Sequence, residues 1–346
     1  MSQARTEEGP PNGPAHFHIQ WHITDRCNLR CLHCYQPAFS KEGELDWPSL
    51  RDIADSLLQT MAGWNMQLDV AITGGEPLIR KEAVLLLQHL DASSRIGQLG
   101  LITNGTLLAK QVGWLQAITH LDELKISIDG TTAAAHDGIR GPGEWRRVLD
   151  NLAAIRRLKA KKIAMFTLLR RNLQEAAGLL DFCRRAGFDG CIIERFFPLG
   201  QGVGQLQEVV SGEEFLALWQ MLLQQTGCEA EPQELIAYRA IRVDFGPHET
   251  DISGSGCIVG SDGCAVMPDG SVLPCRRLPL PIGNLREKSL ARIWDESQLL
   301  AEMRDKSRLK GGCHLCPRDE CRGCRAMSFC LSGDPLGEDP HCWLER

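Results

Sequence analysis

Strand-like and helix-like segments alternate along the first 200 residues, and this alternation limits the possible fold more than any other feature of the sequence. Six apolar runs rich in β-branched residues begin near residues 16, 68, 98, 123, 161 and 190. Helix-like segments separate them near 48–62, 80–90, 109–118, 144–159 and 173–186, and residues 213–225 could supply a sixth. Such alternation predicts an α/β fold with a parallel sheet and right-handed crossovers. Six units are too few for a closed eight-fold barrel, so we expect an open, partial (β/α)6 barrel of TIM type, with a doubly wound open sheet as the alternative.

The last 90 residues differ from the rest, because nine of the fifteen cysteines lie between Cys257 and Cys342. We expect one long helix there, at residues 289–305. The sequence therefore predicts four parts, which are a disordered leader (1–15), a barrel (16–205), a helical linker (206–250) and a cysteine-rich extension (251–346).

Charge and hydrophobicity exclude several classes of protein. The formal net charge of −6 gives no reason to expect nucleic acid or an anionic membrane as a partner. No apolar run reaches the roughly 18 residues of a membrane span, and the first residues lack the apolar segment of a signal peptide. We therefore expect a cytosolic protein, in which so many cysteines indicate bound metal and not disulfides.

Three cysteines follow the first strand in the stretch WHITDRCNLRCLHCYQ, at Cys27, Cys31 and Cys34. Thiolates held in one loop are soft ligands that suit zinc or an iron–sulfur cluster. Three thiolates on a four-iron cluster leave one iron without a protein ligand, and that iron can bind a substrate or cofactor. The alternative is a zinc site completed by His22 or His33.

A second motif, TGGEP at residues 73–77, follows the second strand. Its two glycines would let backbone amides approach a ligand closely, and Glu76 offers a carboxylate to an ammonium group. The pattern C-x3-C-x2-C followed by an aromatic residue, with GGEP one strand later, resembles the radical S-adenosylmethionine (radical SAM) enzymes. TNGT at 103–106, SIDG at 127–130 and HDGIRG at 136–141 extend this resemblance over roughly residues 17–200.

The resemblance implies a partial barrel whose open iron binds the methionine amino and carboxylate groups of S-adenosylmethionine. An electron from the reduced cluster then cleaves a C–S bond, and the resulting 5′-deoxyadenosyl radical abstracts hydrogen from the substrate. Position by position, the resemblance implies that Cys27, Cys31 and Cys34 hold the cluster. It also implies cofactor-binding roles for Tyr35 beside the adenine, for Gly74, Gly75 and Glu76 at the amino group, and for Asn104, Ser127, Asp129 and Arg140 around the ribose, the carboxylate or the substrate.

Each of those last four residues has a simpler alternative. Asn104 and Asp129 each precede a glycine and so fit turns, while Arg140 could be a surface charge.

Eight cysteines of the extension form a further pattern, with two C-x2-C pairs four residues apart, which indicates metal binding. Two zinc sites of four thiolates each would also use all eight. The pattern is similar to the SPASM extension of radical SAM enzymes, which carries two auxiliary four-iron clusters. That resemblance implies three [4Fe-4S] clusters in all, the two auxiliary ones held by Cys257, Cys264, Cys275 and Cys324 and by Cys313, Cys316, Cys321 and Cys342.

Two positions in this extension depart from the family pattern. Cys330 is an additional thiol that could replace Cys324 or Cys321, and the central run C-x2-C-x4-C-x2-C is shorter than the commonest form, C-x2-C-x5-C-x3-C. Arg276 occupies the position at which sulfatase-maturing relatives carry an Asp base. A guanidinium cannot serve as that base, so sulfatase maturation is disfavoured.

Two auxiliary clusters behind a radical site suit oxidation of a substrate, whose last electron leaves through the extension. The extension resembles two groups of enzymes. We expect an enzyme of the first group, which modifies ribosomally synthesised peptides by cross-linking, dehydrogenation or decarboxylation. The alternative is the second group, which tailors haem or tetrapyrrole side chains in haem or haem d1 synthesis. Outside the enzymes, the alternative is a zinc-stabilised binding protein.

The expected partners follow from these readings. The substrate would be a peptide or a small molecule, and flavodoxin or ferredoxin would supply electrons. A peptide substrate would call for a separate recognition protein, because we expect the first strand to begin by about His16, with no recognition domain before it.

Overall fold

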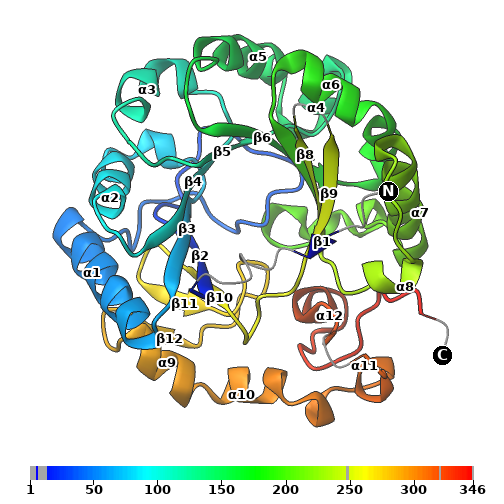
Figure 1. Cartoon of the computed structure of the whole chain (residues 1–346). Coiled ribbons are helices and arrows are strands. Elements are labelled where there is room, and N and C mark those ends of the chain that lie inside the picture. The colour runs from blue at the N-terminus through cyan, green and yellow to red at the C-terminus, as the bar shows by residue number, and fades with distance from the viewer. Residues whose placement is uncertain (1–4, 7–13, 247–248, 319–320, 345–346) are drawn as a thin grey trace.

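A twelve-stranded sheet runs through the computed structural model, which describes residues 5–6, 14–246, 249–318 and 321–344. Its centre consists of six parallel strands in the order β7-β6-β5-β4-β3-β2. Figure 1 shows these strands curving into an open barrel with helices around the outside. The expected partial barrel is therefore confirmed. The six strands are β2 (His16–His22), β3 (Gln67–Thr73), β4 (Ile96–Thr103), β5 (Glu123–Ser127), β6 (Lys161–Leu168) and β7 (Gly190–Arg195).

Helices connect these strands along the outer side of the sheet. They are α1 (Trp47–Trp64), α2 (Glu82–Asp91), α3 (Leu108–Leu115), α4 (Ala133–Arg140), α5 (Glu144–Ala154) and α6 (Leu179–Ala186). The segment predicted as a helix at 173–186 is a 3-10 helix (Arg170–Gly178) followed by α6, and α4 was not predicted. Further 3-10 helices span Pro77–Ile79, Gly200–Gly204, Leu206–Glu208 and Lys306–Arg308.

α1 shows how local sequence sets these elements. The Asp46 carboxylate accepts a hydrogen bond from the backbone N–H of Ser49 (3.0 Å), which satisfies a donor that the first turn leaves without a helical partner. Pro48 in the first turn has no backbone N–H and therefore needs no hydrogen-bond acceptor there. At the other end, Asn65 adopts the left-handed conformation (φ 53°) and ends the helix. Burying each large apolar side chain of its inner face contributes about 1.5–3 kcal/mol, and these residues are Leu50, Ile53, Leu57 and Met61.

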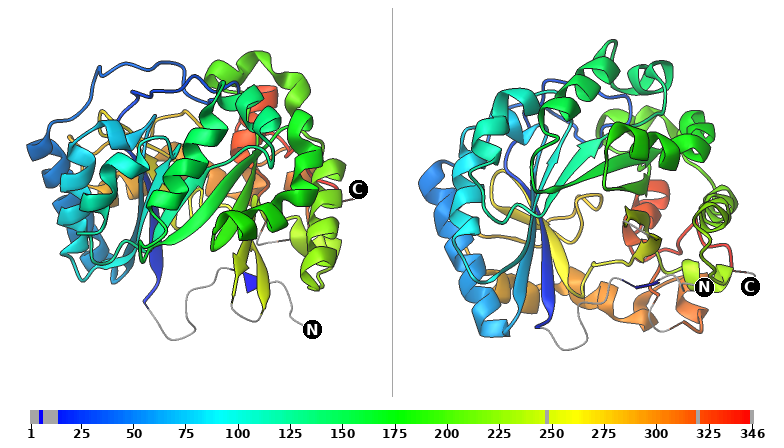
Figure 2. Two further views of the ribbon diagram at one scale, coloured as in Figure 1. Left: turned by 90° about the horizontal axis from the view of Figure 1, so that it is seen from above. Right: turned by 45° about the horizontal axis from the view of Figure 1, so that its top comes forward.

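The C-terminal part of the chain extends the sheet at both edges. After α7 (Gly212–Thr226) and α8 (Pro232–Leu235), β8 (Ala240–Phe245) pairs antiparallel with β7, and β9 (Thr250–Ser255) pairs antiparallel with β8. The chain then crosses the open side of the barrel, as Figure 2 shows, and β10 (Gly263–Val266) pairs parallel with β2. Two short strands, β11 (Ser271–Leu273) and β12 (Gly283–Asn284), complete that edge. Neither β8 nor β9 was predicted from the sequence.

The single helix predicted at 289–305 is wrong, because the structure divides it into α9 (Leu290–Glu296) and α10 (Gln298–Arg304). Ser297 between them is extended (φ −73°, ψ 108°), and its hydroxyl accepts a hydrogen bond from the backbone N–H of Leu300 (3.3 Å). A serine that caps the second helix therefore ends the first. Two shorter helices follow, α11 (Gly312–Leu315) and α12 (Arg325–Ser332).

Most of the predicted leader, residues 1–15, lies outside the described residues, and Arg5–Thr6 pairs with β9 as β1.

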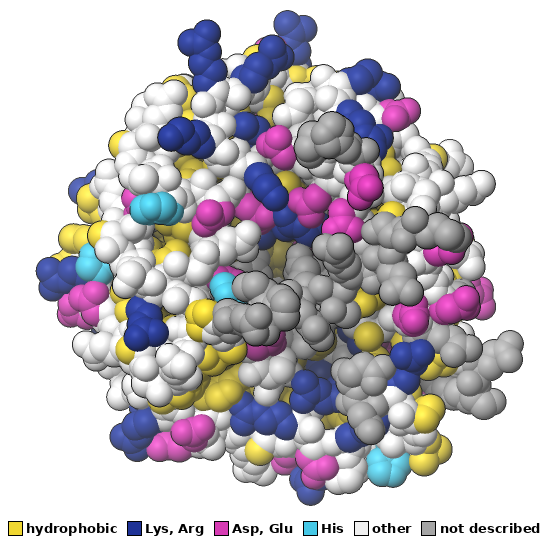
Figure 3. All heavy atoms as spheres, viewed as in Figure 1, with side chains coloured by type: hydrophobic (Ala, Val, Ile, Leu, Met, Phe, Trp, Pro, Cys, Tyr) yellow, Lys and Arg dark blue, Asp and Glu magenta, His cyan; other side chains and the backbone are white. Residues whose placement is uncertain are grey.

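Figure 3 shows the face at which the parallel strands begin, where acidic side chains gather beside basic ones. At the start of β5, Asp122 accepts a hydrogen bond from the backbone N–H of Leu99 (2.8 Å) and Glu123 pairs with Arg242 (2.5 Å). Among the described residues, no helix has the length and apolar character needed to cross a membrane.

Candidate active site

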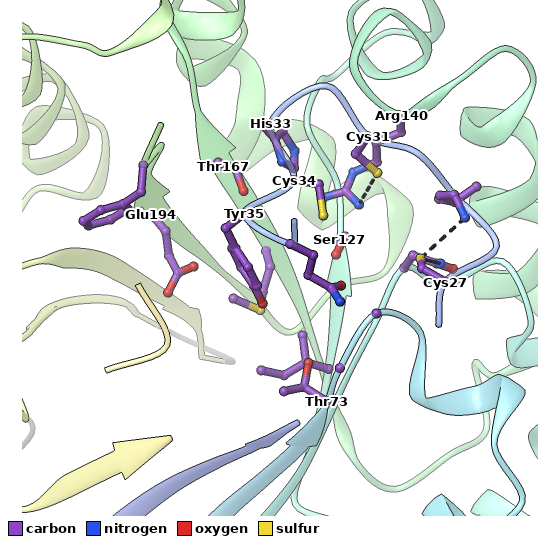
Figure 4. Close-up of a pocket in the computed structure, with 18 of the residues that line it drawn as sticks. Cys27, Cys31, His33, Cys34, Tyr35, Thr73, Ser127, Arg140, Thr167 and Glu194 are labelled. Atoms are coloured by element: carbon purple, nitrogen blue, oxygen red, sulfur yellow. Dashed lines mark hydrogen bonds between the residues drawn. The ribbon is translucent and has the colours of Figure 1, made fainter. Parts of the chain in front are cut away.

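A cavity lies at the carboxyl ends of the parallel strands, the end at which barrel enzymes carry their active sites. Figure 4 shows side chains from the loop after β2, from the ends of β3, β5 and β6, and from β7 pointing toward it. The predicted site residues that line it are Cys27, Cys31, Cys34, Tyr35, Gly74, Gly75, Asn104, Ser127 and Arg140. The structure therefore brings together nine of the eleven positions assigned to the cofactor site, all but Glu76 and Asp129.

The loop that carries Cys27, Cys31 and Cys34 is fixed against its neighbours by backbone hydrogen bonds. The N–H of Gly75 donates to the carbonyl of Thr24 (2.7 Å), and the N–H of Glu76 donates to that of Arg26 (2.8 Å). The two glycines permit this contact, because a Cβ at Gly74 would lie 2.4 Å from the Thr24 oxygen and one at Gly75 only 2.3 Å from that of Arg26. The GGEP motif therefore holds the cysteine loop in place as well as lining the cavity.

The three thiols fit a cluster site in their chemistry and surroundings. Burial raises the pKa of Cys27 and of Cys34, and raises that of Cys31 to about 11, so an isolated thiolate is disfavoured and a bound metal would supply the compensating charge. Polar N–H groups approach two of the sulfurs, the Asn104 amide at 3.8 Å from Cys27 and the Arg140 guanidinium at 3.8 Å from Cys31 (Figure 4). In the described ranges, no three Cys, His, Asp or Glu side chains converge on a single-ion site.

Glu76 lies beneath the cavity and not in its wall. Its side chain is fully buried, and the carboxylate accepts hydrogen bonds from the Thr103 hydroxyl (2.8 Å), the Asn104 backbone N–H (2.8 Å) and the Leu78 backbone N–H (3.0 Å). Burial raises the pKa of Glu76 to about 7. In this arrangement the carboxylate ties the loop after β3 to the loop after β4, and its predicted contact with the cofactor stays a prediction.

Asp129 is also fully buried, and it holds two residues that border the cysteine loop. Its carboxylate lies 2.6 Å from Nε of Arg140 and 2.6 Å from Nε2 of His33, and it accepts a hydrogen bond from the backbone N–H of Thr167 (2.9 Å). Arg140 and His33 hold the pKa of Asp129 well below its usual range despite burial. Asp129 therefore orients Arg140, which in turn faces Cys31. The surface-charge alternative for Arg140 is wrong, because this side chain is only 7% exposed.

Several residues that were not predicted from the sequence also border the cavity, and they are Thr73, Thr167, Glu194, Phe197 and Arg277. His33, which the sequence suggested only as a ligand in the zinc alternative, borders it too. Arg277 pairs with Glu194 and lies over the ring of Phe197 (5.1 Å). The adjacent Arg276 lies over the ring of Tyr35 (4.5 Å). Only one signal in the sequence could have placed Arg277 at the cavity, and that is its position two residues after Cys275, next to Arg276.

The cysteines of the extension separate into groups. The four cysteines assigned to the second auxiliary cluster line a second cavity beside α11. They are Cys313, Cys316, Cys321 and Cys342. Guanidinium groups approach two of these sulfurs, Arg239 at Cys321 (3.2 Å) and Arg325 at Cys313 (3.4 Å). Of the other four, Cys257, Cys275 and Cys324 belong to one apolar cluster, and Cys264 lies in another.

Comparison with known proteins agrees with this geometry. The Radical SAM superfamily matches residues 21–183, and an iron–sulfur cluster-binding domain named SPASM matches residues 257–325. The AdoMet-dependent heme synthase of Methanosarcina barkeri is 29% identical over 340 residues, covering 94% of this chain and 95% of that protein. Mycofactocin maturase MftC of Mycobacterium tuberculosis is 30% identical over 350 residues, covering 94% and 82% of the two chains.

Solved structures share the fold. SuiB of Streptococcus suis bound to its precursor peptide SuiA superposes with a TM-score of 0.70 at 16% identity, over 96% of this chain and 76% of that one. The enzyme anSMEcpe with bound AdoMet and the Kp18Cys peptide superposes with a TM-score of 0.71 at 16% identity, over 94% of each chain.

The chain thus belongs to the radical SAM superfamily, whose members bind S-adenosylmethionine and a [4Fe-4S] cluster. Within that superfamily it is one of the enzymes with a C-terminal SPASM region for auxiliary clusters.

Proposed function

We propose that this enzyme oxidises the propionate side chain of an iron tetrapyrrole, the reading that the sequence analysis kept as its alternative. Three [4Fe-4S] clusters serve the reaction, one in the cysteine loop and two in the extension. The similarity to proteins named AdoMet-dependent heme synthase extends over nearly the full length of both chains, which supports this reading over the expected peptide modification.

The observation that carries the proposal is a pair of adjacent arginines, one on the cavity and one behind its Tyr35 side. Arg277 lines the cavity, whereas Arg276 lines an adjoining cavity, lies over the ring of Tyr35, which borders both cavities, and is 5% exposed. The Nε of Arg276 has no hydrogen-bond partner in the part of the chain that the structure describes. A buried guanidinium with a free N–H suits a substrate carboxylate, which it binds by charge-assisted hydrogen bonds.

Bound S-adenosylmethionine and its cluster supply the radical that removes a hydrogen atom from substrate. The net change R–CH2–CH2–COO⁻ → R–CH=CH2 breaks one C–H and one C–C bond, releasing a hydrogen atom, CO2 and one electron. The hydrogen atom would end in 5′-deoxyadenosine, and an auxiliary cluster held by the cysteines of the extension would take up the electron. Phe197 and Arg277 line the cavity and also adjoin the apolar cluster of Cys275 and Cys324, which supports an acceptor next to the substrate. Flavodoxin or ferredoxin supplies the electron that starts each turnover.

Peptide modification is the second candidate, and one observation favours it. MftC, a maturase by name, has nearly the same sequence identity to this chain (30%) as the heme synthase of Methanosarcina barkeri (29%). A peptide would present its carboxylates or its backbone to the same arginines, so a direct comparison of substrates separates the two functions.

The test uses anaerobically purified protein with S-adenosylmethionine, a chemical reductant and an iron porphyrin that carries propionate groups. Mass spectrometry should show the loss of CO2 and two hydrogens from the propionic acid form, with one 5′-deoxyadenosine for each vinyl group. Unchanged porphyrin, together with modification of a precursor peptide, would refute the tetrapyrrole reading.

Arg276→Ala should raise the KM for the porphyrin about 10- to 100-fold, because a hydrogen bond between charged groups contributes about 1.5–3 kcal/mol. Arg146→Ala is the matched control, since Arg146 is exposed on α5 and pairs only with the exposed Asp150 among the described residues. An equal KM for Arg276→Ala and the control would contradict the assignment of Arg276.

A further inference from the structure

The cysteines that would hold the first auxiliary cluster do not lie together as the family pattern implies. Cys324 is buried in an apolar cluster with Leu278, Met303 and Met327, and three further cysteines pack against that cluster. These three are Cys257, Cys275 and Cys330. Cys264 is absent from this cluster and belongs to the main core of the barrel.

The position of Cys264 follows from its strand. β10 continues the sheet beyond β2, with Cys264 in register with Ile19. Side chains alternate between the two faces of a strand, so Cys264 points to the same face as Val266, and both are 0% exposed within the main core. Cys264 therefore behaves as a small apolar side chain.

Cys330, unlike Cys264, packs against the apolar cluster that contains Cys324. It lies on α12, the helix that begins directly after Cys324, and its Sγ approaches the backbone carbonyl of Arg277 at 3.9 Å. That carbonyl is two residues from Cys275.

Packing connects the four thiols. Cys257, Cys275 and Cys330 all pack against the apolar cluster that contains Cys324, so these four cysteines form one group.

We propose that Cys330, and not Cys264, is the fourth ligand of the first auxiliary cluster, together with Cys257, Cys275 and Cys324. This assignment rests on the two auxiliary clusters of the proposed function but not on the identity of the substrate. Cys330 then replaces neither Cys324 nor Cys321, because the second group, around α11, already has its own four thiols. Four protein thiolates close the cluster and leave none of its irons open to substrate, which suits an electron acceptor.

The experiment compares full-length wild-type protein with Cys264→Ala and Cys330→Ala, each purified anaerobically. The measurements are iron and sulfide per chain and the electron paramagnetic resonance (EPR) spectrum of the reduced protein, before any substrate is added. Wild type and Cys264→Ala should hold about twelve irons with the same spectrum. Cys330→Ala should lose about four irons, or keep them with one altered cluster signal.

Cys330→Ser distinguishes the loss of a ligand from a folding defect, because serine has a similar size and offers an oxygen ligand. It should retain the wild-type circular dichroism spectrum while one cluster signal shifts. Three results would overturn the proposal: Cys264→Ala losing a cluster, Cys330→Ala keeping iron and spectrum unchanged, or wild type holding only about four irons. Because no substrate is present, failure of this test is distinct from failure of the tetrapyrrole assay.

Discussion

Replacing Asp129 by Asn tests whether a buried carboxylate positions the arginine beside the cysteine loop. Asp129 is 0% and Arg140 is 7% exposed, and the two groups lie 2.6 Å apart. An Asn side chain can still accept the hydrogen bond from Thr167, but it leaves the Arg140 charge buried without a counter-ion. Breaking a buried pair in this way costs about 3–5 kcal/mol, a large fraction of a typical folding free energy of about 5–15 kcal/mol.

The assay is chemical unfolding at pH 7 of anaerobically purified protein, followed by circular dichroism, with 5′-deoxyadenosine formation measured in parallel. At this pH the contribution of Asp129 is fully present, because its lowered pKa means that stability is lost only as the pH falls through the acidic range. Asp129→Asn should lower the free energy of unfolding by about 3–5 kcal/mol and reduce 5′-deoxyadenosine formation.

Two further variants make the result specific. Asp150→Asn removes the carboxylate of an exposed pair with Arg146 and should cost no more than about 0.5 kcal/mol. Adding Arg140→Met to Asp129→Asn removes the unpaired buried charge and should restore part of the stability. If Asp129→Asn is no less stable than Asp150→Asn, the positioning role argued for Asp129 is wrong.

Two other predictions follow from the site. Replacing Cys27, Cys31 and Cys34 together by Ala should abolish 5′-deoxyadenosine formation while about eight irons stay in the extension, as measured by iron analysis; zinc in place of iron would support the binding-protein alternative. The pKa of Glu76, raised from 4.5 to about 7, makes the folded state bind a proton more tightly than the unfolded state, so about 3 kcal/mol of stability should be lost as the pH rises from about 4.5 to 7. Glu76→Gln lacks this titration, and unfolding curves at pH 5 and pH 7.5 should show a smaller decrease than wild type; an equal decrease would contradict the assignment.

The barrel could be predicted from sequence because its six parallel strands are buried on one face and largely covered on the other. Runs such as LDVAIT and GCIIERFF are apolar for that reason, and they stand out from the helices between them. β9, with the sequence TDISGS, lies next to the edge of the sheet, beside the two-residue β1, and has no comparable apolar run, so sequence alone did not reveal it. The break at Ser297 was missed because its neighbours on both sides are good helix formers.

The sequence motifs predicted residues that the structure places around one cavity, but not the contacts that each of them makes. The cysteine loop, the two glycines and Arg140 line that cavity. Sequence could not show that Glu76 and Asp129 bind other protein groups beneath the cavity, because burial depends on segments far apart in the chain. For the same reason cysteine spacing alone does not distinguish Cys264 from Cys330, since spacing does not record the face of β10 on which Cys264 lies.

The pairing of β10 with β2 has a consequence for how the chain is made. β2 ends at His22, and the strand that covers its outer edge begins only at Gly263, 241 residues later by subtraction. At about 5–20 residues per second, a ribosome needs roughly 10 to 50 s to cover that interval. Throughout this time the nascent barrel displays the unpaired N–H and C=O groups of an apolar edge strand, a template for aggregation. The late C-terminal segment therefore acts as an internal protector of the first strand, and chains that stop before it are the ones most exposed to misassembly.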